Sequence, residues 1–418
     1  MDDKMGKTAE EQYRERLKRV EDAVQLNIPD RVPVLASFRY FPARYVGMTY
    51  EDVYHKPEEW IEANRKAVLD FQPDMYYPPI TESGKAYEIL GIKQVKWPGH
   101  DIPPDSSHQY VEEEYMKDDE YDSFLTDTSN WIIRSYLPRI SEAMEPLRDL
   151  PSLDSMFFGY HSLSMVAALL AQPEFENALK SLLEAGREIT KTQAAVNGFD
   201  EQMARLGFPS IGRVTLAAFD VVSDFHRGMR GSMLDMYRQP DKLLKAIEKI
   251  EPIVLDNAII LSRISGNPRV FIPLHRGADG FMSDEQFRTF YWPSLKRLFL
   301  SLIDKGLTPC PFFEGNVDSR LEYLRELPKG KVMARFDTTD VFMAKEIIGD
   351  MMCICGNVPV SIMQVGTPDD VKSYCKKLID VVGKDGGFIM CTRSVLDEAK
   401  PENVKIWIDF TKEYGVYQ

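Results

Sequence analysis

Short apolar runs alternate with amphipathic helical patterns along most of this chain, and each run is short enough to be a strand buried on both faces. The runs span residues 31–36, 74–78, 155–160, 270–274, 308–313, 332–336, 351–355 and 387–391. In the clearest helical pattern between them, Leu243, Ile247 and Ile250 share one face. Eight strands that alternate with helices predict an α/β fold, a closed (β/α)8 TIM barrel, with an open doubly wound sheet as the alternative.

Three stretches depart from this alternation. Residues 1–30 are predicted to form an N-terminal helical extension, because 8–26 carry an amphipathic pattern that Asn27-Ile-Pro-Asp30 ends. Residues 31–418 then form the barrel, which is the catalytic domain, with helical insertions. Residues 95–135 are rich in Pro, Asp and Glu, which predicts a solvated excursion. The stretch 160–240 is helical but longer than a crossover needs, which predicts a lid or an interface.

Composition removes several classes of function. Hydrophobic residues make up 44% and charged residues 28%, which is typical of a globular protein. The net charge of -14 disfavours nucleic acid as a partner, because its phosphate backbone would be repelled. No apolar run approaches the roughly 20 residues of a membrane span, and the first residues lack a signal-peptide core. Five cysteines, an odd number, do not make a disulfide framework. We therefore expect a cytoplasmic protein with no membrane segment.

Candidate metal ligands stand at the ends of three predicted strands. Glu314 and Cys355 are each followed by Gly-Asn-Val, and Cys391 ends the last apolar run. Because zinc accepts thiolate sulfur and carboxylate oxygen, these three residues predict a zinc site with its fourth position open. Cysteine also serves as a small core residue, so buried filler is the alternative. Cys353 is the alternative sulfur ligand. Asp337 could be a fourth zinc ligand, a residue that contacts one of the ligands, or the cap of a helix.

Residues that could contact a substrate follow other predicted strands. His275 ends one strand and could bind or protonate a substrate, and His161 ends another; a hydrogen-bonded structural role is the alternative for both. Phe38, Tyr40 and Phe312 could wall an aromatic pocket, although aromatic clusters are also common in cores.

Several motifs together resemble the uroporphyrinogen decarboxylase superfamily. They are Asp30-Arg-Val-Pro-Val34, Met282-Ser-Asp-Glu-Gln-Phe with Tyr291-Trp-Pro293, Gly356-Asn-Val with Gly366-Thr-Pro-Asp-Asp-Val371, and Lys400-Pro-Glu-Asn-Val404. The resemblance covers most of the chain and implies a (β/α)8 barrel. That superfamily contains true decarboxylases and zinc-dependent corrinoid methyltransferases, so the choice between the two branches rests on the site.

The site departs from the decarboxylases and from the thiol methyltransferases. Where the decarboxylases carry an arginine-rich stretch for porphyrinogen propionates, this chain keeps only Arg39 and Arg44. Where methylcobalamin:thiol methyltransferases carry His-x-Cys-Gly-Asn, it has Phe312-Phe-Glu314-Gly-Asn. Residues 109–122 are similar to the methyltransferase I components of anaerobic O-demethylases, whose zinc ligands vary.

That resemblance implies a zinc-dependent enzyme of anaerobic C1 metabolism. Such an enzyme moves a methyl group from a methoxylated aromatic compound to the cobalt(I) of a corrinoid protein, and the cobalamin is carried by that partner protein. A methylcobalamin:thiol methyltransferase and a metal-free decarboxylase-like enzyme are the alternatives. The corrinoid protein would dock transiently at the barrel mouth, and a homodimer is compatible with the sequence.

Overall fold

Eight parallel strands form the centre of the fold in the computed structural model, which describes residues 7–157 and 159–418. The six-stranded sheet has the order β10-β9-β8-β7-β6-β5, and β1 pairs with β2. The strands are β1 (Leu35–Ala36), β2 (Met75–Tyr76), β5 (Arg213–Val214), β6 (Arg269–Leu274), β7 (Thr308–Phe313), β8 (Met333–Phe336), β9 (Cys353–Cys355) and β10 (Phe388–Ile389).

Two isolated bridges join the strand pair to the larger sheet and close the ring. Val34, next to β1, bridges in parallel to Met390 beyond β10. Tyr76 of β2 bridges in parallel to Ser210, just before β5. The strands therefore follow one another around a closed parallel barrel, and the predicted (β/α)8 class is confirmed.

One of the eight predicted strands is wrong. The first two residues of the strand expected at 155–160 instead end a short helix, α9 (Leu153–Met156), and residue 158 lies outside the described part. The third barrel strand is β5 instead, where the Thr215 N–H donates to the carbonyl of Phe271 on β6. Both residues of β5 are exposed, so no apolar run marks this strand in the sequence.

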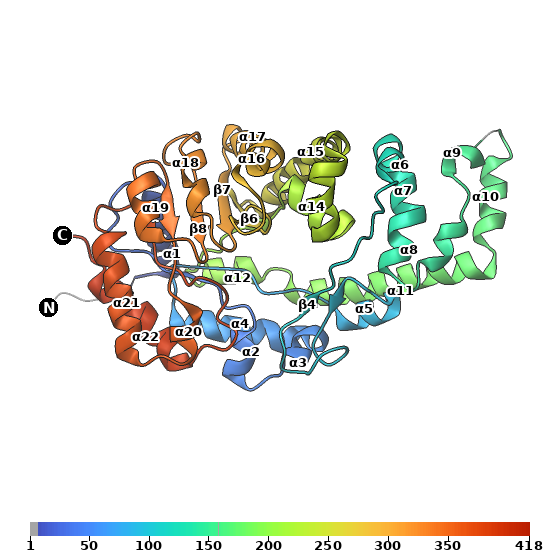
Figure 1. The fold of residues 1–418 in the computed structure, drawn as a ribbon. Helices are drawn as coiled ribbons and strands as arrows, with labels where there is room; N and C mark the ends of the chain where they lie inside the picture. Colours follow the sequence, from blue (N-terminus) through green and yellow to red (C-terminus); the bar gives the residue numbers. More distant parts are fainter. Residues whose placement is uncertain (1–6, 158) are drawn as a thin grey trace.

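Helices follow the barrel strands, and most of them cover the outside of the ring (Figure 1). After β1 come α2 (Phe41–Val46), α3 (Tyr50–His55) and α4 (Pro57–Phe71). After β5 come α13 (Ala218–Val221), the π-helical segment η3 (Val222–Arg227), α14 (Gly228–Arg238) and α15 (Pro240–Ser265). Later crossovers hold α16 (Asp284–Gln286), η4 (Phe287–Tyr291), α17 (Trp292–Asp304), η5 (Asp318–Arg320), α18 (Leu321–Leu324), α19 (Val341–Ile348), α20 (Val360–Gln364) and α21 (Pro368–Val381), and α22 (Pro401–Tyr414) follows β10.

A long insertion separates β2 from β5. It begins with α5 (Gly84–Leu90) and an antiparallel pair, β3 (Val95–Lys96) with β4 (Gln109–Tyr110). It continues through α6 (Tyr121–Thr126), α7 (Thr128–Trp131), η1 (Ile132–Tyr136), α8 (Leu137–Ile140), η2 (Glu145–Asp149), α9, α10 (Ser162–Leu170), α11 (Pro173–Val196) and α12 (Phe199–Arg205). In Figure 1 the helices α9, α10 and the start of α11 project away from the barrel, to the right of the view.

The barrel interior is filled by one buried side-chain cluster, and four of the five cysteines belong to it. Its members include Leu35, Met75, Ile211, Cys310, Met333, Cys353, Cys355, Ile389 and Cys391. Cys375 instead lies in the larger core between the strands and their helices. The N-terminal helix α1 (Ala9–Val24) contributes Val20, Ala23 and Val24 to the interior cluster. Helix α1 therefore packs against the barrel.

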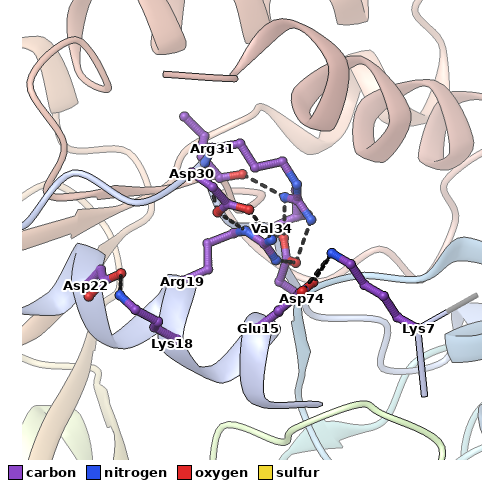
Figure 2. Close-up of polar contacts among 10 residues, drawn as sticks. Lys7, Glu15, Lys18, Arg19, Asp22, Asp30, Arg31, Val34 and Asp74 are labelled. Carbon is purple, nitrogen blue, oxygen red and sulfur yellow. Dashed lines mark hydrogen bonds and ion pairs between the residues drawn. The ribbon is translucent and has the colours of Figure 1, made fainter. Parts of the chain in front are cut away.

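A buried group of ions attaches α1 to the barrel (Figure 2). The Asp74 carboxylate, at the start of β2, has no exposed surface and accepts hydrogen bonds from Arg19 at 2.7 Å and from both terminal nitrogens of Arg31 at 2.7 Å. It also accepts the Val34 N–H at 2.9 Å. Arg19 in addition donates to Asp30. Because these arginines fully satisfy the carboxylate, the charge is tolerated in the interior.

The acidic stretch 109–122 is not only a solvated excursion. Glu112 forms an ion pair with Arg276 at 3.1 Å, and Glu114 lies 3.2 Å from the buried Arg227. Arg227 also pairs with the buried Asp235 at 2.6 Å. The stretch therefore packs against η3, α14 and the residues that follow β6, at the carboxyl-terminal end of the barrel.

Candidate functional site

His275 directly follows β6 and lies in a cluster of carboxylates. Its Nδ1 is 2.5 Å from Asp224, and its Nε2 is 3.7 Å from Oε1 of Glu314. Burial acts to lower the pKa of His275, but the hydrogen bond with Asp224 and the charges of Asp220 and Glu314 outweigh it and raise the pKa to about 9. The imidazole is therefore cationic at neutral pH, and its Nε2 faces the strand end that carries Glu314.

Asp220 and Asp224 reach His275 from the segment that follows β5. Asp224 lies in the π-helical η3, and such segments are frequent at functional sites. Asp220 is completely buried and accepts hydrogen bonds from the His275 backbone N–H at 3.0 Å and from the Tyr291 hydroxyl at 2.9 Å. Its other oxygen has no partner among the described atoms. Burial and the neighbouring Asp224 raise the pKa of Asp220 to about 7.

Glu314 and Asp337 lie at neighbouring strand ends. Burial raises the pKa of Glu314, and Asp337 adds to this, while His275 opposes it. Asp337 follows β8, and its carboxylate accepts the Gly315 N–H at 3.2 Å. The sequence placed both residues at strand ends correctly, and the structure brings Glu314 and His275 together.

Cys355 and Cys391 meet inside the barrel near the carboxyl ends of β9 and β10. Both are fully buried. Burial acts to raise the pKa of Cys391, but the contact with Cys355, the charge of Arg335 and the bonds to Thr392 outweigh it and lower the pKa to about 7. The Cys355 pKa is raised well above its ordinary value by burial and by Cys391. Of the two thiols, that of Cys391 therefore loses its proton more readily.

Arg335 is the cation beside these thiols. It lies on β8 in register with Phe312 on β7 and Cys355 on β9, and it is buried. Its guanidinium stands 4.3 Å from the centre of the Phe312 ring and donates to the carbonyls of Thr392 and Ser394 at 3.1 Å. Arg335 also acts on the Glu314 pKa, so its charge reaches both the thiols and the carboxylate.

The proposed zinc ligands meet only in part. Cys355 and Cys391 are in contact, whereas Glu314 faces His275, and across residues 7–157 and 159–418 no three His, Cys, Asp or Glu side chains converge closely enough to hold a metal ion. The donor chemistry nevertheless fits zinc, since a thiolate is the form that binds metal and the lowered pKa of Cys391 favours its thiolate. Cys353, the alternative sulfur ligand, interacts with Cys310 and Lys345, and its charge also acts on Cys355.

The predicted substrate-contacting residues occupy different environments. Phe38 is buried against Phe41 and Phe71, and Tyr40 is buried with its hydroxyl 2.7 Å from His108. Phe312 lies under Arg335 near the thiols. His161 is exposed at the start of α10, on the part of the insertion that projects from the barrel (Figure 1).

Sequence reasoning missed Asp220, Asp224 and Arg335. Asp220 and Asp224 follow the strand that the apolar pattern did not reveal, so their position at a strand end was hidden. Arg335 had a visible signal, because it is a single charged residue inside the apolar run 332–336.

Comparisons with known proteins agree with this architecture. A sequence profile of the family "Uroporphyrinogen decarboxylase (URO-D)" matches residues 160–414. The uroporphyrinogen decarboxylase of Chlorobium phaeobacteroides is 22% identical over 249 residues, which are 58% of this chain and 68% of the relative. That of Coxiella burnetii is 21% identical over 251 residues, covering 59% and 66%.

A solved structure extends the likeness to nearly the whole chain. A methyltransferase from Methanosarcina mazei superposes with a TM-score of 0.60 over 96% of this chain and 98% of that chain, at 15% identity. At this identity the likeness shows a shared fold. None of the described helices combines the length and apolar character needed to cross a bilayer.

Proposed function

The chain belongs to the uroporphyrinogen decarboxylase family, and within that family we propose that it is a methyltransferase. It moves a methyl group from a methoxylated aromatic compound to the cobalt(I) of a separate corrinoid protein. The C–O bond of the ether breaks, the methyl group passes to cobalt to give methyl-cobalt(III), and the electron pair stays on oxygen, which takes up a proton to give the phenol.

The observation that carries this proposal is the contact between the two buried thiols of Cys355 and Cys391, near the carboxyl ends of β9 and β10 and beside the buried Arg335. A thiol that ionises near neutral pH inside a barrel has a chemical use as a metal ligand. We propose that Glu314, Cys355 and Cys391 hold a zinc ion. When bound, zinc supplies a Lewis acid that stabilises negative charge on the departing oxygen.

His275 has the geometry to supply the proton. Its Nδ1 is fixed by Asp224 at 2.5 Å, so its Nε2 is the nitrogen left to face the site. A phenoxide is a poor leaving group, and a positioned donor beside the ether oxygen lowers the barrier to its departure. Asp224 acts through His275 and is therefore a positioning residue.

A decarboxylase is the second candidate, since the curated relatives in this family carry that name. Its substrate has many carboxylates, which require several free cations. Of the two arginines after β1, Arg39 already contacts His108 at 2.5 Å. The neighbouring Tyr40, Tyr54 and His108 form one hydrogen-bonded group, and burial lowers the pKa of His108 to about 4, so this histidine is neutral. This region therefore supports the methyltransferase more than the decarboxylase.

Metal analysis of the purified chain tests the zinc site. We expect about one zinc per chain in the wild type and almost none in Cys391→Ser, because losing one of three protein ligands weakens binding strongly. Cys375→Ala is the matched control, since Cys375 is buried in the outer core, and it should keep its zinc.

Circular dichroism separates metal loss from unfolding. Cys391→Ser should keep the wild-type spectrum, because a catalytic zinc is not required for the fold. Equal zinc contents in Cys391→Ser and the wild type would exclude the proposed ligand set. A wild type without zinc that decarboxylates uroporphyrinogen would favour the second candidate, and methyl transfer from methylcobalamin to a free thiol would identify the chain as a thiol methyltransferase.

A further inference from the structure

Arg276, the residue after His275, joins the candidate site to the acidic stretch that follows β4. One terminal nitrogen of its guanidinium, Nη2, lies 2.8 Å from Oδ1 of Asp224 and 3.1 Å from Oε2 of Glu112. The Nε of the same guanidinium donates to the hydroxyl of Ser223 at 3.1 Å. The guanidinium is therefore held by three side chains, and one of them belongs to a segment far away in the sequence.

Asp224 has a different partner at each of its carboxylate oxygens. Oδ2 lies 2.5 Å from Nδ1 of His275, and Oδ1 faces Arg276. The side chain of Asp224 is 11% exposed and that of Arg276 is 16% exposed, so water competes little for their contact. A carboxylate that is held at both oxygens cannot rotate without losing a partner. The orientation of the imidazole ring therefore depends on Arg276 as well as on Asp224.

Residues 112–116, here called the strap, lie against η3 and the start of α14. The Met116 N–H donates to the carbonyl of His226 at 2.7 Å, and the Glu112 carboxylate accepts the Met229 N–H. The segment η3 also carries the carboxylate that contacts the imidazole ring. The strap and that carboxylate are therefore supported by the same part of the fold.

We infer that Glu112 and Arg276 are positioning residues for the imidazole of His275, and that they order the strap and this ring together. The inference rests on the proposed function, in which His275 supplies the proton to the departing oxygen. Without Glu112 the guanidinium keeps two of its three side-chain partners, so it holds Asp224 less firmly. A general acid must keep its proton directed at the leaving atom, and a ring that can turn therefore transfers its proton less often.

Glu114 provides the matched comparison within the strap. Its carboxylate lies 3.2 Å from Arg227, and its side chain is 37% exposed, against 36% for Glu112. Arg227 pairs with the buried Asp235 at 2.6 Å. The two glutamates therefore carry the same charge, have nearly the same exposure and each contact an arginine. They differ in what that arginine holds, since only the partner of Glu112 pairs with Asp224.

Kinetics of methyl transfer with the zinc-loaded chain test the positioning role. Glu112→Gln should lower kcat by about 5-fold with little change in KM, because residues in one ion-pair network couple with energies that correspond to such a factor. Glu114→Gln should keep the wild-type kcat. The double variant Glu112→Gln with Asp224→Asn should lose no more than Asp224→Asn alone, since Glu112 acts through that carboxylate. Both glutamine variants should keep the wild-type thermal midpoint, because each removes a partly exposed charge.

Nuclear magnetic resonance of isotope-labelled histidine tests the ordering of the ring without any substrate. The chain has six histidines, and the signal that is absent in His275→Gln identifies the ring of His275. At a fixed pH, Glu112→Gln should shift or broaden this signal, whereas Glu114→Gln should leave it as in the wild type.

Two results would overturn the inference. One is a His275 signal that Glu112→Gln leaves unchanged or that both glutamine variants change equally. The other is a double variant whose loss in kcat is the product of the two single losses. If the wild type transfers no methyl group while the signal of His275 responds to Glu112→Gln alone, the proposed function fails and the ordering of the ring by Glu112 stands.

Discussion

At the scale of single residues, we expect buried charged side chains to have the largest individual effects on stability, because the loss of one partner leaves an uncompensated charge in the interior. Asp74 shows this most directly, because a fully buried carboxylate is surrounded by Arg19 and Arg31. Burial acts to raise the pKa of Asp74, but the hydrogen bonds and charges of Arg31 and Arg19 outweigh it and hold the pKa below its ordinary value. Removing the carboxylate charge leaves two guanidinium groups without their partner.

Asp74→Asn should therefore lower the free energy of unfolding by about 3–5 kcal/mol at pH 7. Because the folded-state pKa is depressed, the contribution of Asp74 is complete above its unfolded value of about 3.9 and is lost as the pH falls through the folded value. Denaturant unfolding should show the gap between wild type and Asp74→Asn narrowing as the solution is acidified.

Asp22→Asn is the matched control for Asp74→Asn. Asp22 lies on α1, the helix that carries Arg19 (Figure 2), and it pairs with Lys18; the side chain of Lys18 is 73% exposed and that of Asp22 is 18% exposed. Such a surface pair contributes about 0.5 kcal/mol or less. Equal losses in the two variants would show that burial does not govern the strength of these ion pairs.

The His275–Asp224 pair gives a second prediction for single residues. Asp224→Asn should lower kcat by roughly 100-fold with a smaller change in KM, because the imidazole loses the partner that fixes its orientation. His275→Gln should cost a similar factor, and the double variant should cost little more than either one, since the two side chains act as one unit. Additive losses in single-turnover assays would contradict this.

At the scale of elements, the strength of the apolar pattern decided what could be predicted. Seven of the eight barrel strands were predicted near their observed positions, because their residues are buried on both faces and read as apolar runs. The third strand was missed, since β5 has two exposed residues and follows Gly212. The apolar run at 155–160 predicts a strand, but the chain is helical at its start, because periodicity does not distinguish a short apolar strand from a short apolar helix.

Gly212 makes β5 possible, and this can be tested. Its φ is +116°, and a Cβ at this position would lie 2.0 Å from the carbonyl oxygen of Arg269 on β6. Gly212→Ala should lower the free energy of unfolding by about 3 kcal/mol or more, from the combined backbone strain and overlap.

Gly266→Ala separates the two causes. Gly266 also has a positive φ, of +65°, but an added Cβ would meet nothing within 4 Å. Gly266→Ala should therefore lower the free energy of unfolding only through backbone strain, by about 1–2 kcal/mol. Thermal or denaturant unfolding that gives the two alanine variants equal losses would mean that β5 does not press against β6 as described.

The candidate site was predictable to the extent that strand ends fix positions. Parallel strands bring their carboxyl ends to one edge, so Glu314, His275, Cys355 and Cys391 could be assigned to one end of the barrel from the sequence. Which of them touch could not be predicted, because this depends on side chains from other segments. The hydrogen bond with Asp224 holds His275 against η3, and Arg335 lies beside the thiols of Cys355 and Cys391.

At the scale of the whole molecule, the carboxyl-terminal end of the barrel and the projecting helices α9 and α10 are separate parts of the structure (Figure 1). The barrel brings His275, Asp224 and Glu314 together at its carboxyl-terminal end, whereas the helices α9 and α10 project away from the barrel (Figure 1). The proposed reaction needs a cobalt carrier that arrives at the carboxyl-terminal end of the barrel and leaves again.

The central claim is methyl transfer from a methoxylated aromatic compound to cobalt(I), and the most direct measurement follows the cobalt. The zinc-loaded chain is mixed with reduced corrinoid protein and a panel of methoxybenzoates, and the conversion of cobalt(I) to methyl-cobalt(III) is followed by absorbance. We predict methyl-cobalt formation with at least one compound for the wild type and Cys375→Ala, and none above background for Cys391→Ser. A fully zinc-loaded wild type that forms no methyl-cobalt with any compound of a broad panel would contradict the proposed function.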